Sequence, residues 1–255
     1  MVPEKKIAEF VKRIREASGT NLESVILYGS AVAGDFHPEF SNLNLFCVLR
    51  DSSFPALQAL LPAAKWWDRQ KQPPPLLMTR AELLRSTDIF TIELLDMQQH
   101  HRVLFGEDVL QGLRISMHAH RIQVEYELRE KLILLRQQSV LASDSTQQLW
   151  NLILRSLPSF VTLFRHALIA LGTASPEGKR EAVQMLSKQV GFDPRAIEQV
   201  LDVREQKTAP GKLDIHDLFA RYLASVEHVA AAVDQAMDQD AADHDASNAD
   251  ARGHR

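Results

Sequence analysis

The sequence predicts an α/β domain over residues 1–110, a mixed sheet flanked by helices, followed by an all-α helical bundle over residues 111–237. Two observations support this division. Apolar runs of strand length alternate with helical patterns in the first part, whereas from about Leu110 the apolar residues recur at helical spacing. The last segment, residues 238–255, holds few large apolar residues, so we expect a disordered acidic tail there.

The composition indicates a soluble globular protein. Of the 255 residues, 45% are hydrophobic and 24% are charged, which is ordinary for a folded chain with a sizeable core. No run approaches the roughly twenty apolar residues that a membrane span needs, and the N-terminus lacks the apolar core of a signal peptide. The single cysteine suits a reducing compartment, so we expect a cytoplasmic protein without membrane partners.

The charge distribution provides no strong nucleic-acid signal. The formal net charge is −4, and the stretch from Asp234 to Arg255 holds six Asp and two Arg, which accounts for the whole excess. The folded body is therefore close to neutral, whereas broad nucleic-acid binding requires a basic surface.

The first elements are a helix and two strands. Apolar residues one turn apart predict an amphipathic helix over residues 3–18, and a strand over residues 24–28 follows it. In the second strand, over residues 42–49, alternation separates two faces. Leu43, Leu45, Cys47 and Leu49 share one face, and Asn42, Asn44, Phe46 and Val48 share the other. We therefore expect Cys47 to be a packed core residue and not a nucleophile.

The remaining elements of the first domain follow from turn and capping signals. We expect a helix over residues 53–67 that Pro62 interrupts, a strand over residues 76–78, and a short helix that begins with the capping box Thr79–Glu82. Next, we expect a strand over residues 89–95 with Glu93 in its middle and a helix over residues 96–104. In the bundle we expect helices over residues 110–141, 146–171, 176–190, 194–205 and 214–237.

The spacing of the histidines favours hydrogen-bonded roles over metal binding. His118 and His120 are two residues apart on an expected helix, so they point to different faces. His166 follows Arg165 near the end of an apolar helix. Two interpretations of this pair remain open: it lines a groove between the domains, or it forms an interhelical hydrogen bond.

A turn and two asparagines carry the strongest functional signal. The apolar strand ends at Tyr28 and is followed by Gly29 and Ser30, and the next strand begins with Asn42 and Asn44. Backbone N–H groups at the start of a short helix after Gly29 could receive a phosphate, and glycine allows close approach. Side chains two apart on a strand share a face, so Asn42 and Asn44 should project together.

This arrangement resembles the nucleotidyltransferase superfamily, which includes DNA polymerase β and the aminoglycoside and minimal nucleotidyltransferases. In that family an apolar strand, Gly-Ser and about ten residues precede Asp-x-Asp on the next strand. Here the stretch Tyr28–Ser30 and the spacing to Ser41–Phe46 match, but both metal-binding aspartates are replaced, by Asn42 and Asn44. The helical bundle that often follows the catalytic domain in this family is similar to the second half of the chain only in architecture.

The replacement bears directly on the metal chemistry. Nucleotidyl transfer develops charge on phosphate oxygens that Mg²⁺ neutralises, and Mg²⁺ prefers anionic oxygen ligands. Asparagine offers one neutral oxygen and two N–H donors. We therefore expect a degenerate site at Asn42 and Asn44, with Mg²⁺ binding weak or absent, and a nucleoside triphosphate as the candidate ligand at Gly29 and Ser30.

The resemblance also implies a third carboxylate on a later strand. Glu93 fits that position as a remnant of the metal site, and Asp96 is the other candidate. The alternative interpretation is that Glu93 is a partly exposed strand residue paired with a nearby Lys or Arg.

Three functions remain open from the sequence. The first is a pseudoenzyme that binds a nucleotide or regulates a protein partner. The second is an active enzyme that transfers a nucleoside monophosphate to a small molecule or protein, with Glu93, Asp35 or Glu39 as substitute ligands. The third is a scaffold that binds no nucleotide. Whether the chain is an enzyme therefore stays undecided at this stage.

Overall fold

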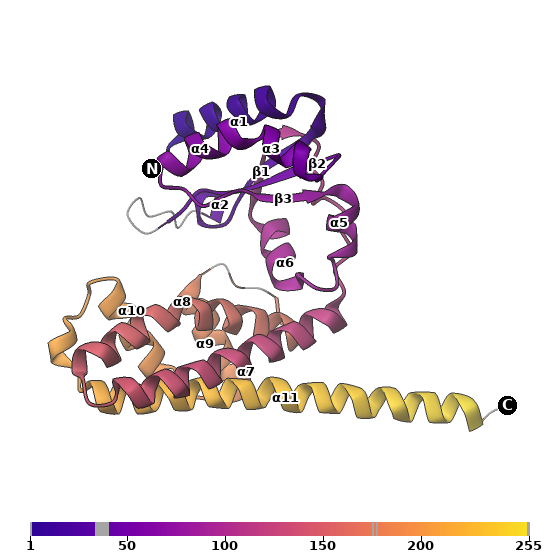
Figure 1. Cartoon of the computed structure of the whole chain (residues 1–255). Coiled ribbons are helices and arrows are strands. Elements are labelled where there is room, and N and C mark those ends of the chain that lie inside the picture. Colours follow the sequence, from indigo (N-terminus) through magenta and orange to yellow (C-terminus); the bar gives the residue numbers. More distant parts are fainter. Residues whose placement is uncertain (1, 34–40, 175, 177, 254–255) are drawn as a thin grey trace. The chain divides into compact units, whose positions relative to one another are not determined.

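The described part of the chain forms two compact units (Figure 1). The computed structural model describes residues 2–33, 41–174, 176 and 178–253, with side chains as far as Ala236. Unit 1 spans Met1–Ser116 and unit 2 spans Met117–Arg255. Unit 1 combines a sheet with helices and unit 2 is helical, so the predicted fold class is confirmed.

Unit 1 is built on a mixed four-stranded sheet. Strand β1 is central and pairs antiparallel with β2 and β4, while β3 pairs parallel with β2, in the order β3-β2-β1-β4. The strands are β1 (Leu22–Tyr28), β2 (Asn44–Leu49), β3 (Leu76–Thr79) and β4 (His101–Gly106). The first three strands lie where the sequence predicted strands.

Helices cover both faces of this sheet. In Figure 1, α1 and α4 lie side by side on one face, and the apolar residues of α6 pack against the other. The helical segments of unit 1 are α1 (Glu4–Ser18), η1 (Gly19–Asn21), α2 (Ser30–Ala33), α3 (Phe54–Ala59), α4 (Leu61–Arg69), α5 (Arg80–Arg85) and α6 (Thr91–Gln99). The single helix expected over residues 53–67 is thus two helices, because Pro62 removes a backbone donor at the junction.

The alternation in β2 assigns the core as predicted. Leu45 and Cys47 pack with Phe10 of α1 on one face, whereas Phe46 and Val48 pack with residues of α6 on the other. The capping box is also confirmed, because the Thr79 side chain accepts from the Glu82 N–H and the Glu82 carboxylate accepts from the Thr79 N–H.

Two predictions around residue 95 are wrong. Residues 89–95 do not form a strand, since α6 covers Thr91–Gln99, and residues 101–104 are not helical but belong to β4. Three of the four buried residues of α6, namely Thr91, Leu94 and Met97, are spaced by one helical turn. The next apolar run, Val103–Phe105, pairs with β1. Short apolar runs fit either structure, and tertiary pairing decides between them.

Unit 2 consists of helices packed around α8. Its elements are α7 (Met117–Ala142), α8 (Thr146–Ala170), α9 (Lys179–Val190), α10 (Arg195–Arg204), η2 (Pro210–Lys212) and α11 (Ile215–Gly253). The first helix begins at Met117 and not near Leu110. Residues 238–253, for which the sequence predicted disorder, continue α11 beyond the expected end near Met237.

Helix α8 forms the core of unit 2. Among the helices of the described residues it is the one long and apolar enough to cross a bilayer, but 56% of that apolar window is buried in the protein. On α8, Nδ1 of the fully buried His166 lies 2.9 Å from Nε2 of His120 on α7, and the two rings share a hydrogen bond. The interhelical hydrogen bond expected as one interpretation of His166 is therefore present, and α8 has the character of a core helix.

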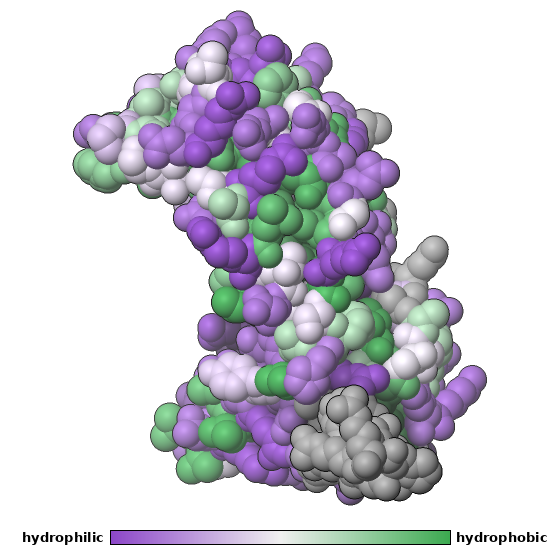
Figure 2. Space-filling model, turned by 90° about the vertical axis from the view of Figure 1, so that its right-hand side faces the viewer, coloured by the Kyte–Doolittle hydropathy of each residue, from purple (hydrophilic) through white to green (hydrophobic). Residues whose placement is uncertain are grey.

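The surface mixes polar and apolar side chains. On the face that Figure 2 shows, green apolar side chains gather between purple polar ones. In unit 1 the largest exposed apolar residues include Phe54, Leu84 and Ile89, each more than half exposed. Surface hydropathy therefore does not single out a ligand site.

A test of the β1–β4 edge is Gly106→Ala. Gly106 has φ +76°, and a Cβ there would lie 1.9 Å from the Glu23 carbonyl oxygen, so the strand must shift. We expect the free energy of unfolding to fall by more than about 2 kcal/mol, measured by urea denaturation with tryptophan fluorescence. The matched control is Gly112→Ala, which has φ +80° but nothing within 4 Å, and should cost only the strain of about 1 kcal/mol. Equal losses would contradict this close contact.

Candidate functional site

The turn after β1 has the conformation that the sequence predicted. Gly29 has φ +77°, and its N–H donates to the His100 carbonyl at 3.3 Å. The Gly29 carbonyl accepts from Val32 and Ala33 at 2.9 and 3.0 Å, which starts α2 at Ser30. The first N–H groups of a helix have no intrahelical acceptor, so those of Ser30 and Ala31 are the donors that this turn presents.

Asn44 lies directly beside this turn. It is opposite Tyr28 in the β1–β2 ladder, and a Cβ on Gly29 would lie 3.1 Å from its Nδ2. Asn42 precedes β2 and is exposed, while Leu43 between the two asparagines is buried. The turn and the second half of the motif thus meet at Gly29 and Asn44. A larger residue at position 29 would enter the space that the amide occupies.

A row of polar side chains crosses the sheet at this end. Asn44, Tyr28 and His101 are directly opposite one another on β2, β1 and β4. Residues opposite one another in an antiparallel ladder project to the same face. Tyr28 packs with the apolar cluster that contains Ile26 and Phe46, so this is the face that α6 covers. His101 was not among the predicted site residues, because residues 96–104 were expected to form a helix and His101 instead begins β4.

His101 forms a hydrogen bond with Asp108, which was not among the predicted site residues either. Its Nε2 lies 3.0 Å from Oδ2 of Asp108, and the other oxygen of Asp108 accepts from the N–H groups of Leu110 and Gln111, each at 3.1 Å. Burial works to raise the pKa of Asp108. The hydrogen bond and charge of His101, with the two backbone donors, outweigh burial and lower the pKa. The carboxylate is thus ionised, with both oxygens engaged.

Glu93 is near this row, although not on a strand. It lies in the first turn of α6 and is exposed, so the expected position of Glu93 in the middle of a strand is wrong. The pKa of Tyr28 is raised, first by burial and second by the negative charge of Glu93. The third carboxylate that the resemblance implied therefore acts on the residue that precedes the Gly-Ser turn. Asp96 follows one turn later on the same helix.

The described side chains do not fit a magnesium site. Among residues 2–33, 41–174, 176 and 178–236, no three His, Cys, Asp or Glu side chains lie close enough to hold a metal ion. The family's metal positions hold the neutral amides of Asn42 and Asn44, and amide N–H groups repel a cation. Asp35 and Glu39, the expected substitute ligands, lie outside the described residues.

Cys47 has no catalytic environment. It is fully buried with Phe10 and Leu45, on the face of the sheet opposite Asn44. Burial raises the pKa of its thiol to about 12, whereas a nucleophilic cysteine needs a lowered pKa. The prediction that Cys47 is a core residue is confirmed.

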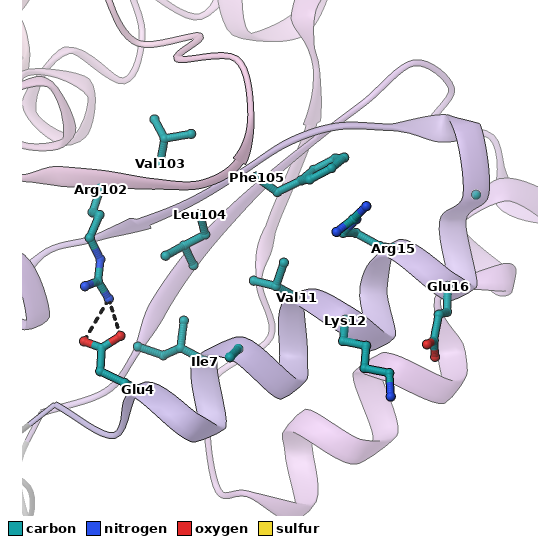
Figure 3. A pocket seen from close by; sticks show the side chains of 12 residues that line it. Glu4, Ile7, Val11, Lys12, Arg15, Glu16, Arg102, Val103, Leu104 and Phe105 are labelled. Atoms are coloured by element: carbon teal, nitrogen blue, oxygen red, sulfur yellow. Dashed lines mark hydrogen bonds and ion pairs between the residues drawn. The ribbon is translucent and has the colours of Figure 1, made fainter.

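One groove of unit 1 is separate from the polar row. It lies between α1 and the edge strand β4 and encloses about 820 Å³ (Figure 3). In Figure 3, Glu4 binds Arg102 at one end and Arg15 lies over the Phe105 ring at the other, 4.5 Å from its centroid. Leu104 packs with the apolar cluster of α1, so this groove borders the sheet face opposite the polar row. We therefore take the end of β1, not the groove, as the candidate site.

Comparisons with known proteins indicate the kind of domain that unit 1 forms. Residues 4–95 match the family model of the nucleotidyltransferase domain. A crystal structure of spectinomycin adenyltransferase from Enterococcus faecialis, solved with ATP and spectinomycin, covers 88% of this chain and 99% of its own chain. Its TM-score is 0.50 and its sequence identity is 14%, so the likeness concerns the fold. A search among curated proteins found no match.

The proximity of Glu93 to the polar row is tested by Glu93→Gln. Removing the negative charge should lower the pKa of Tyr28, while burial still keeps it above the ordinary value of 10.0. The measurement is a titration of phenolate absorbance. The chain has three tyrosines, so Tyr28→Phe identifies the part of the signal that comes from Tyr28. Burial also raises the pKa of Tyr222, so its signal comes later. Glu9→Gln on α1 is the control. An unchanged Tyr28 titration in Glu93→Gln would contradict the proximity.

Proposed function

We propose that this chain, a member of the nucleotidyltransferase superfamily, binds a nucleoside triphosphate at the Gly29–Ser30 turn without catalysing metal-dependent nucleotidyl transfer. The observation that carries the proposal is the position of Asn44. Asn44 lies beside the Gly29 turn, so a neutral amide occupies the position where the family has a metal-binding carboxylate.

Phosphate binding is supported by the backbone of the turn. Gly29 adopts a positive φ and carries no side chain, so a phosphate could approach the N–H groups of Ser30 and Ala31 closely. Asn44 adds an amide, which can donate to a phosphate oxygen and, unlike a carboxylate, does not repel it. Replacing two acids removes two negative charges from the surroundings of an anionic ligand.

The same replacement argues against ordinary transfer chemistry. Two magnesium ions in such a site neutralise the charge that develops on the phosphates, and their protein ligands are carboxylates. Among the described residues, Glu93 is the carboxylate whose negative charge raises the pKa of Tyr28, the last residue of β1. A single exposed carboxylate would not replace a pair of ligands on β2.

The comparison supports one class of ligand by analogy. The similar structure was solved with ATP and a small molecule, spectinomycin. By analogy we propose a nucleotide, with or without a small molecule, as the ligand of this chain. A regulatory role toward a protein partner and a cytoplasmic location remain predictions from the sequence.

Two alternatives stay open. One is an active nucleotidyltransferase in which Glu93, together with Asp35 or Glu39, supplies the metal ligands; the match of residues 4–95 to the nucleotidyltransferase domain favours testing it. The other is a scaffold that binds no nucleotide at this turn. The two experiments below separate these alternatives from the proposal.

The first experiment measures the melting temperature with ATP, GTP, CTP and UTP in EDTA. A nucleotide at a hundred times its dissociation constant should stabilise the protein by about 2.7 kcal/mol. Gly29→Ala should lose this shift, because its Cβ points at the Asn44 amide. The matched control is Gly172→Ala, with φ +81° and nothing within 4 Å, which should keep the shift. A wild-type protein that none of the four nucleotides stabilises would point to the scaffold.

The second experiment restores the acids with Asn42→Asp and Asn44→Asp together. We expect no pyrophosphate release from ATP by the wild type in Mg²⁺ with spectinomycin as a trial acceptor, and at least a tenfold higher rate in the double variant. Asn151→Asp on the exposed surface of α8 is the control and should stay inactive. Equal activity in the wild type and the double variant would overturn the proposal and favour substitute ligands.

A further inference from the structure

His101 is placed beside the candidate phosphate site by the sheet itself. It is opposite Tyr28 in the β1–β4 ladder, and its neighbour His100 accepts the Gly29 N–H. The same face therefore presents Asn44, Tyr28 and His101 in a row, directly before the turn. His101 belongs to neither the Gly-Ser turn nor the pair of asparagines, and the proposed function does not use it.

Asp108 fixes the orientation of the His101 ring. An ionised carboxylate only accepts hydrogen bonds, so Nε2 of His101 donates to Asp108 over 3.0 Å. Both oxygens of Asp108 are engaged, one by His101 and the other by two backbone N–H groups, so the carboxylate cannot rotate without losing bonds. This arrangement leaves Nδ1 as the ring atom for another partner, and the side chain is 16% exposed.

Two acids lie near His101, and one of them pairs with its ring. Asp108, from the segment after β4, is the acid in contact with the ring, and the exposed Glu93 of α6 acts on the neighbouring Tyr28. To bridge the Asp108 carboxylate and a phosphate, the His101 ring must carry an N–H on each nitrogen, one for each anion. The β2 residue in this row is the neutral amide Asn44, so no acid on β2 competes for this ring.

We propose that His101, positioned by Asp108, contacts the phosphate chain of the bound nucleotide and supplies a positive group at a site that lacks metal ligands. The inference rests on the proposed function, because it needs a nucleotide at the Gly29–Ser30 turn. Its ligand class is a nucleoside triphosphate, and its mode of binding is a charge-assisted hydrogen bond.

If His101 and Asp108 had only a structural role, their substitution would have a different effect. Asp108 closes the turn that leads out of β4, so His101 and Asp108 could serve only to hold that turn. In that case a substitution would change the stability of unit 1 and would weaken all nucleotides to the same degree. A phosphate contact instead weakens a ligand more, the more phosphates it carries.

The test is the binding of ATP, ADP and AMP in EDTA, measured by calorimetry on the full chain. His101→Gln keeps a donor for Asp108, so the turn should stay closed. We expect it to weaken ATP about tenfold and AMP less than twofold. Asp108→Asn keeps acceptors for the backbone N–H groups but loses the charge, and should weaken ATP by a smaller factor. Urea denaturation of each variant checks that the fold is retained.

The control variant for this test lies in unit 2. His216→Gln replaces an exposed histidine of unit 2 and should leave the three affinities unchanged. Equal weakening of ATP, ADP and AMP in His101→Gln, or no weakening, would overturn the role of His101 while leaving nucleotide binding in place. A wild-type protein that binds none of the three would overturn the proposed function and this inference together.

Discussion

The candidate site depends on the pairing of β1 with both of its neighbours. This ladder places Tyr28 between Asn44 and His101, and the chain then turns at Gly29 with a positive φ. Because opposite residues share a face, three residues far apart in the sequence project together. The two apolar clusters hold the sheet from both sides, so the register cannot slip by one residue without exposing the core.

The electrostatic character of the site differs from that of a metal-dependent transferase. A carboxylate at position 44 would attract a divalent cation and would repel phosphate unless that cation were bound. An amide at the same position does neither. The nearest acids either pair with a histidine, as Asp108 does, or lie exposed on a helix, as Glu93 does. In the proposed function, weak metal binding and a direct phosphate contact are two consequences of one pair of substitutions.

Much of this could be predicted from the sequence, because the signals are local. Alternation assigned both faces of β2, the capping box located the start of α5, and Gly29 marked the turn before α2. The segment from Ile89 to Gly106 could not be predicted, since a short apolar run fits a strand or a helix until its partner is known. The role of His101 was missed for the same reason: only the register of β4 places it opposite Tyr28.

The central claim is that nucleotide binding at the Gly29–Ser30 turn does not depend on a divalent metal. The most direct measurement is the dissociation constant of ATP by calorimetry, once in EDTA and once in saturating Mg²⁺. Our account predicts two values that agree within about threefold, because the neutral amides of Asn42 and Asn44 occupy the positions at which an acid pair would hold a metal between protein and phosphate. Binding that is tenfold or more tighter in Mg²⁺, about 1.4 kcal/mol, would contradict it and would indicate a functional metal site.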